Sequence, residues 1–136
     1  MYKKEVIINN SGKRQAPLFY GAIMNDWIKN APFAVTVCDG NGLITEMNDK
    51  AGKTFEKYGG LGLIGSNLLD CHPEPAKTRL NAMLTNPLTP PNAYTIEKNG
   101  IKKLIYQFVR IKDGKSGGLV ELSLELPGDI PHYIRK

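Results

Sequence analysis

The segment Cys71-His72-Pro73 has the greatest capacity for chemistry in this sequence. A neutral imidazole is a good metal ligand, and histidine is the side chain that changes charge near neutral pH. His72 lies just before a predicted helix, whereas the other histidine, His132, lies in the C-terminal tail. The alternative is structural: His72 caps the helix or forms a hydrogen bond in a loop, and Pro73 fixes the turn. The residues alone leave both interpretations open.

The remaining reactive side chains form no arrangement typical of an enzyme. Cys38 and Cys71 make no C-x-x-C pair, so neither a zinc site nor a disulfide framework is expected. Cys71 is predicted to be a plain buried cysteine, because adjacent side chains rarely point at each other and no oxyanion-binding group is visible. The glycines of 59–62 lack the lysine of a phosphate-binding loop, and no carboxylate pair has an acid–base context. We therefore predict a protein that is not an enzyme and has no catalytic residues.

The composition is that of one globular domain. The chain has 136 residues, of which 41% are hydrophobic and 23% charged, so disorder throughout is excluded. The longest uncharged apolar stretch, 31–38, is too short to span a bilayer, and the N-terminus lacks the apolar core of a signal peptide. Two cysteines without a framework agree with a reducing compartment. We predict a cytoplasmic protein with no membrane partner.

The net charge of +5 comes mostly from the two ends of the chain. Residues 1–15 carry four basic side chains and one acidic one, and 127–136 carry two basic and one acidic. The remaining 12 basic and 11 acidic residues nearly balance within 16–126. A nucleic-acid-binding domain would concentrate positive charge on a folded face. We therefore predict no nucleic-acid partner.

The hydrophobic pattern divides the chain into a basic arm (1–17), a single domain (18–126) and a proline-containing tail (127–136). The domain is predicted to begin with a helix over 18–29, where apolar residues are four positions apart. Two strands follow, then short helices interrupted by the glycines of 59–62, then three more strands with turns at Asn99-Gly100 and in a flexible loop over 113–118. The expected strands are 33–38, 43–47, 93–98, 101–112 and 119–126, and the expected short helices begin near 48, 64 and 73.

Four sequence motifs resemble those of the PAS domain, a common sensory module. Asn30-Ala31-Pro32-Phe33-Ala34-Val35 resembles the start of the first PAS strand, and residues 37–44 resemble its "D-x-x-G-x-I" hairpin. The "N-x-x-A-x-x-x-F" helix has its counterparts in Asn48, Ala51 and Phe55, and residues 63–68 resemble the "I-G-x-x-L" segment. Cys71-His72-Pro73 is similar to an element of bacterial PAS domains that accompany hemerythrin-like modules. The resemblance covers about 18–126.

The resemblance implies an α+β fold in which a five-stranded antiparallel sheet carries short helices on one face and the N-terminal helix on the other. It implies a sensor or signalling domain that binds a small apolar molecule, a partner protein, or both. Some PAS domains bind haem through a histidine near the third short helix, which here corresponds to His72. Flavin-binding relatives carry an "N-C-R-F-L-Q" helix that this chain lacks. Pro127 and Pro131 replace the usual helical exit, so the output partner is expected in trans.

Two sites follow from this arrangement. A ligand is expected between the short helices and the inner sheet face. We predict that Val37 also lies on this face. We predict that the ligand-binding residues are Phe55, Leu69, His72, Leu80, Met83, Tyr106, Leu122 and Leu124. A filled core without a cavity is the alternative. The N-terminal helix is rich in aromatic residues, which favours a homodimer interface made by Phe19, Tyr20, Ile23 and Trp27. A homodimerisation module without any ligand therefore remains a further alternative.

Overall fold

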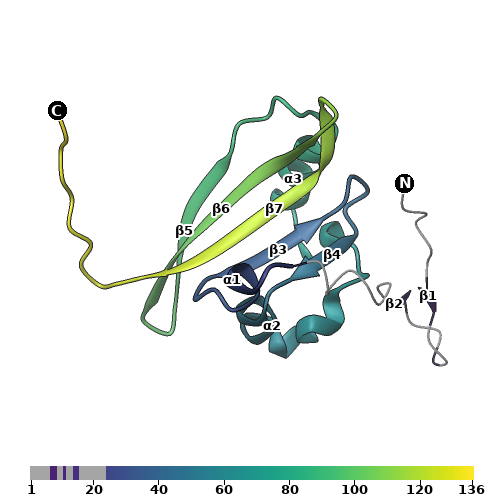
Figure 1. Cartoon of the computed structure of the whole chain (residues 1–136), viewed down its shortest axis with the longest axis horizontal. Helices are drawn as coiled ribbons and strands as arrows, with labels where there is room; N and C mark the ends of the chain where they lie inside the picture. Colours follow the sequence, from purple (N-terminus) through teal and green to yellow (C-terminus); the bar gives the residue numbers. More distant parts are fainter. Residues whose placement is uncertain (1–6, 9–10, 12–13, 16–23) are drawn as a thin grey trace.

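The computed structural model describes residues 7–8, 11, 14–15 and 24–136 (Figure 1). Its main element is an antiparallel sheet with the strand order β4-β3-β7-β6-β5. Two further strands of two residues each, β1 (Ile7–Ile8) and β2 (Arg14–Gln15), pair only with each other. The predicted five-stranded antiparallel sheet is confirmed. Its strands are β3 (Ala34–Cys38), β4 (Ile44–Met47), β5 (Asn92–Lys98), β6 (Ile101–Lys112) and β7 (Lys115–Leu126).

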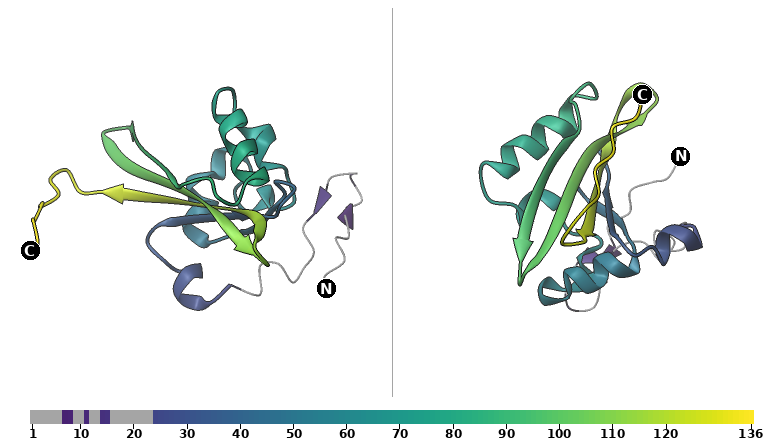
Figure 2. Two further views of the ribbon diagram at one scale, coloured as in Figure 1. Left: turned by 90° about the horizontal axis from the view of Figure 1, so that it is seen from above. Right: turned by 90° about the vertical axis from the view of Figure 1, so that its left-hand side faces the viewer.

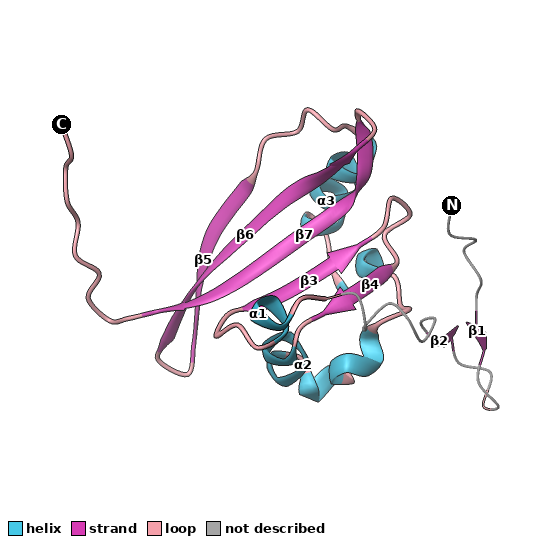
Figure 3. Cartoon of the chain, viewed as in Figure 1, coloured by secondary structure: helices cyan, strands magenta, loops and turns pink. Residues whose placement is uncertain are grey.

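The short helices follow β4 in the chain and pack on one face of the sheet, here called the inner face (Figures 2 and 3). This face carries Ala34 and Cys38 of β3 and Leu119 of β7, which form the hydrophobic core with Leu80 and Met83. The helices are α2 (Asp49–Thr54), η1 (Glu56–Tyr58), η2 (Gly60–Leu63), η3 (Leu68–Cys71) and α3 (Ala76–Thr85). Gly60 and Gly62, which were expected only to interrupt a helix, are thus part of the 3-10 helix η2, and Gly59 precedes it.

The N-terminal helix is shorter within the described residues than the predicted 18–29. Residues 18–23 lie outside the described part, and α1 spans Asp26–Lys29. It lies on the opposite face of the sheet, the outer face (Figure 2), where Trp27 and Ile28 border a groove with Val35 and Val37. The predicted placement of helices on both faces is confirmed.

The hairpin between β5 and β6 turns at Asn99-Gly100, as predicted; both residues have positive φ. The predicted flexible loop at 113–118 is wrong. Only Asp113 and Gly114 form the turn, and β7 begins at Lys115. The strand pairs continue to the turn because Lys112 pairs with Lys115 and Ile111 with Ser116.

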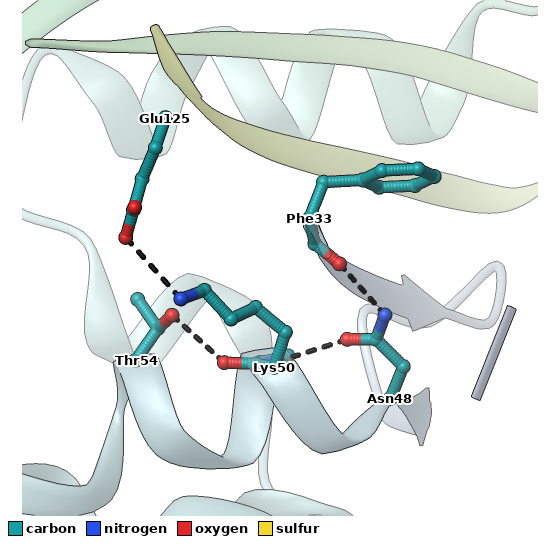
Figure 4. Close-up of polar contacts among 6 residues, drawn as sticks. Phe33, Asn48, Lys50, Thr54 and Glu125 are labelled. Atoms are coloured by element: carbon teal, nitrogen blue, oxygen red, sulfur yellow. Dashed lines mark hydrogen bonds and ion pairs between the residues drawn. The ribbon is translucent and has the colours of Figure 1, made fainter. Parts of the chain in front are cut away.

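Asn48 connects three parts of the fold. Its side chain caps α2 by accepting a hydrogen bond from Ala51 N, and the same oxygen accepts one from Val35 N, each at 2.9 Å. Its Nδ2 donates to the carbonyl oxygen of Phe33 at 2.8 Å (Figure 4) and to that of Ile28 at 2.9 Å. Nearby, Lys50 of α2 forms an ion pair of 3.3 Å with Glu125 of β7 (Figure 4). The buried side chain of Asn48 thus positions α1, β3 and α2.

Candidate functional site

A cavity of about 490 Å³ separates part of the inner face from the short helices. Its volume lies within the usual range for small-molecule sites, roughly 300–1,000 Å³. The sheet contributes one wall, and η1, η2 and η3 contribute the other. Most of the lining is apolar, and Thr36, Cys71, His72 and Glu121 add polar groups. The apolar lining consists of Ile44, Met47, Phe55, Leu63 and Leu68, and the ring of Tyr58 completes it.

His72 is half-buried at the end of η3 and lines this cavity. Its Nδ1 lies 2.8 Å from the carbonyl oxygen of Leu68. A carbonyl oxygen only accepts, so Nδ1 carries the proton. In the neutral ring, Nε2 then keeps its lone pair for a ligand. The predicted loop hydrogen bond and the predicted ligating role are therefore compatible.

A row of polar side chains crosses the inner face beside the cavity. Asn92 of β5, Gln107 of β6 and Glu121 of β7 are register neighbours. Asn92 Nδ2 donates to Gln107 Oε1 at 2.9 Å, and Gln107 Nε2 donates to Glu121 Oε2 at 2.7 Å. Thr36 continues the row on β3, opposite Glu121. Gln107 and Thr36 are buried. Burying polar groups is unfavourable unless they are hydrogen-bonded, and the bonds with Asn92 and Glu121 meet that need for Gln107.

The two cysteines differ in environment. Burial raises the pKa of the Cys38 thiol to about 11, so this side chain stays protonated and unreactive at neutral pH. Cys71 is exposed, contrary to the predicted buried cysteine, because η3 lies at the rim of the cavity. Its Sγ is 3.8 Å from the carbonyl oxygen of Asn67. Among the described residues, no group of three or more His, Cys, Asp or Glu side chains is placed to hold a metal ion.

The structure distributes the predicted ligand-binding residues over three regions. Phe55 and His72 line the cavity. Leu69 is partly buried and packs against the core. Leu80 and Met83 are core residues that are almost completely buried, and α3 places them beside the cavity lining rather than in it.

The expectation that Tyr106, Leu122 and Leu124 line the site is wrong. Tyr106 pairs with Leu122, and Leu124 pairs with Leu104, on the outer face. Val37 is also on that face. Alternation correctly placed Val37, Tyr106, Leu122 and Leu124 together, but the helices cover the other face. They cover it because Cys38 and Leu119 pack there against Leu80 and Met83.

The cavity-lining residues that the sequence did not predict include Glu121 and Thr36. Glu121 alternates with leucines along β7, a pattern typical of a strand with one face on the core and one face toward solvent. One signal pointed the other way: Gln107 interrupts the apolar series between Ile105 and Val109 on β6. A buried amide needs a partner on a neighbouring strand, and Glu121 is that partner.

Most of the predicted dimer interface lies outside the described residues. This applies to Phe19, Tyr20 and Ile23. Trp27 is described, and 68% of its surface is exposed. A large exposed aromatic side chain at the edge of an apolar sheet face is typical of an interaction surface. In the described part of the chain, no helix is long and apolar enough to span a bilayer.

The fold matches solved PAS structures. The Aer2 receptor from Vibrio cholerae, a dual PAS–haem oxygen sensor, is similar with a TM-score of 0.53 and 15% identity, over 71% of this chain and 96% of that one. The PAS domain of an HTR-like protein from Haloarcula marismortui has a TM-score of 0.50 and 12% identity, over 74% and 91%. The sensor region of a sensor histidine kinase has a TM-score of 0.54 and 16% identity, over 76% of this chain and 42% of that one.

These likenesses show that the chain has the PAS fold, as the sequence motifs predicted. No protein-family model matches the sequence, and no curated protein matches it either. Folds host many functions, so the function must be argued from the site.

Proposed function

We propose that this chain is a sensory domain that binds a small, mostly apolar molecule in the cavity between the inner face and η1–η3. The cavity itself is the observation that carries the proposal. It is lined by aliphatic and aromatic side chains with a few polar groups, which is the usual composition of a small-molecule site. A domain whose core were simply filled would need no space of about 490 Å³ there.

The strands that line the cavity also form the outer face, and this provides a route for a signal. Glu121 faces the cavity, whereas its neighbours Val120 and Leu122 lie on the outer face. A ligand that shifts Glu121 therefore displaces β7 and the side chains on its opposite side. The contacts of a partner protein or a second copy bound to the outer face would change with that displacement.

Haem is the second candidate ligand, and the tautomer of the His72 ring favours it. The hydrogen bond from Nδ1 to the Leu68 carbonyl fixes the tautomer in which Nε2 can ligate iron. Such an outer hydrogen bond is typical of metal-bound histidines. The lining is apolar enough for a porphyrin, and His72 is the residue that would hold it. Bound haem would supply an iron centre for a diatomic gas.

Native mass spectrometry and an absorption spectrum of protein purified without refolding distinguish these candidates. We expect a non-covalent small molecule in the wild type and its loss in Leu63→Trp, because the larger side chain fills the cavity that Leu63 lines. If the molecule is haem, the spectrum shows a Soret band that His72→Ala removes.

Leu88→Trp is the control, since this loop residue is 87% exposed and does not line the cavity. It should retain the bound molecule. Equal occupancy in wild type and Leu63→Trp would contradict binding in this cavity. A folded wild type that binds no haem on titration would contradict the haem alternative alone.

We also propose a homodimer in which two copies cover each other's outer face. This face is apolar and only partly buried within the described residues. Two of its aromatic rings, Tyr106 and Phe108, lie 6.2 Å apart between centroids. Contiguous apolar surface of this kind is typical of protein interfaces. It is formed by Leu104, Tyr106, Phe108, Leu122, Leu124 and Leu126.

The variant Leu122→Glu should weaken the dimer about 30-fold or more, because a charged side chain would be buried at a central interface position. Sedimentation velocity over a range of concentrations measures this shift. Leu88→Glu adds the same charge on an exposed loop and should leave the dimer intact. A wild type that sediments as a monomer at all concentrations would overturn the proposal.

A further inference from the structure

We infer that the cavity selects an apolar molecule carrying a protonated amine, with the amine bound at Glu121. This inference deepens the proposed function and rests on it, since it names the class of ligand for the same cavity.

The first observation is the direction of the hydrogen bonds on the inner face. Each amide in the row donates toward the cavity: Asn92 to Gln107, and Gln107 to Glu121. The row therefore ends in a carboxylate that already accepts one hydrogen bond at Oε2. A carboxylate has about four lone-pair positions, so its further capacity is for accepting. Glu121 lines the cavity, and a ligand that donates a proton fits it.

The second observation is that the charge of Glu121 has no ion-pair partner among the described residues. Within residues 24–136, no lysine, arginine or histidine nitrogen lies at ion-pair distance from its carboxylate. The next inner-face carboxylate on the same strand, Glu125, differs in this respect because Lys50 neutralises it. Burial raises the pKa of Tyr94 and the negative charge of Glu121 raises it further, while the positive charge of Arg79 opposes both, so the charge of Glu121 acts on the inner face although Arg79 makes no ion pair with it. A cationic ligand group would supply the missing positive charge.

The third observation concerns His72, another polar group of the cavity. The Nδ1 proton of His72 is used by the Leu68 carbonyl, which leaves an accepting Nε2 in the neutral ring. Glu121, and the Nε2 of His72 when its ring is neutral, thus both offer acceptors to a ligand. An apolar carboxylate, such as a fatty acid, would bring its negative charge beside that of Glu121, and among the described residues no lysine or arginine lines the cavity. An amine can instead donate to either group, and the apolar walls hold its carbon skeleton.

Three probes of similar size test the inference: 2-phenylethylamine, 2-phenylethanol and 3-phenylpropionate. Isothermal titration at pH 7 measures each with the wild type. We expect the amine to bind about tenfold more tightly than the alcohol, as a charge-assisted hydrogen bond implies, and the acid more weakly than both. Glu121→Gln should bring the amine and alcohol affinities within about threefold of each other while changing the alcohol affinity little.

The matched control is Glu125→Gln. It removes the same charge from the same strand and face, but Glu125 does not line the cavity. It should keep the wild-type preference for the amine. A thermal unfolding scan verifies that both variants fold. If Glu121→Gln does not fold, the order of the affinities of the three probes for the wild type tests the inference.

Equal binding of amine and alcohol to the wild type would overturn this inference and leave the proposed function standing, because the cavity would still bind an apolar ligand. Loss of the preference in both variants would also overturn it, since the effect would then be one of net charge. If none of the probes binds at millimolar concentration, the inference is wrong, and the proposed function is then decided separately by the occupancy of Leu63→Trp.

Discussion

Asn48→Ala is expected to lower the free energy of unfolding by about 4 kcal/mol, because the substitution leaves four backbone groups without their partner. The side chain is completely buried and accepts from two backbone N–H groups while donating to two carbonyl oxygens. Water cannot reach Val35 N once the side chain is lost, since β3 is buried along its whole length. Typical domains unfold with about 5–15 kcal/mol, so this loss is a large share. Urea denaturation followed by circular dichroism measures it.

Asn67→Ala is the matched control. Asn67 also caps a helix, η3, because its side-chain oxygen accepts a hydrogen bond from Leu69 N at 2.9 Å. The hydrogen bond from its Nδ2 to the carbonyl oxygen of Asn41, however, is solvent-exposed. Water replaces those partners, and a cost of about 1 kcal/mol is expected. Similar losses in the two variants would show that the buried position of Asn48 has no special role. A further consequence is weaker ligand binding by Asn48→Ala, because α2 leads into Phe55, a wall of the cavity.

Gly118→Ala is expected to destabilise the fold by about 3–5 kcal/mol, through a clash between β7 and β3. A Cβ at this position would lie 1.9 Å from the carbonyl oxygen of Cys38, and the φ of +128° disfavours any other residue. The clash is with backbone, so no rotamer change relieves it. The two strands would separate where Cys38 pairs with Leu119, next to the core. Thermal unfolding monitors the overall loss.

Gly114→Ala separates the clash from the backbone strain. Its φ is also positive, at +73°, but a Cβ there would meet nothing within 4 Å, so a loss of about 1–2 kcal/mol is expected. Reactivity of Cys38 toward a thiol reagent, in a Cys71→Ser background, adds a local measurement. Because burial raises the pKa of Cys38 to about 11, the thiol should react slowly in the parent and faster in Gly118→Ala. Equal stability of the two glycine variants would contradict the clash.

The local elements of this protein follow from short-range features of its amino-acid sequence. Apolar alternation over 119–126 and the Asn99-Gly100 turn predicted β7 and the β5–β6 hairpin, and the motif of Asn48, Ala51 and Phe55 predicted the capped helix α2. These features depend on neighbours a few positions away, since capping, turn geometry and strand alternation are short-range. The PAS motifs, read in order, were enough for the fold because they follow the order of those elements.

The face of the sheet that receives the helices depends on contacts between residues distant in sequence. Alternation places Leu122 and Leu124 on one face and Glu121 and Ser123 on the other, but it does not show which face the helices cover. The more apolar set was assigned to the ligand site, whereas Cys38, Leu119, Leu80 and Met83 pack on the other face. That packing joins residues of β3, β7 and α3 that are distant in sequence. It also brings the Gln107–Glu121 pair to the cavity and leaves the leucines on the outer face, which is why the carboxylate of the site could not be predicted from the strand that carries it.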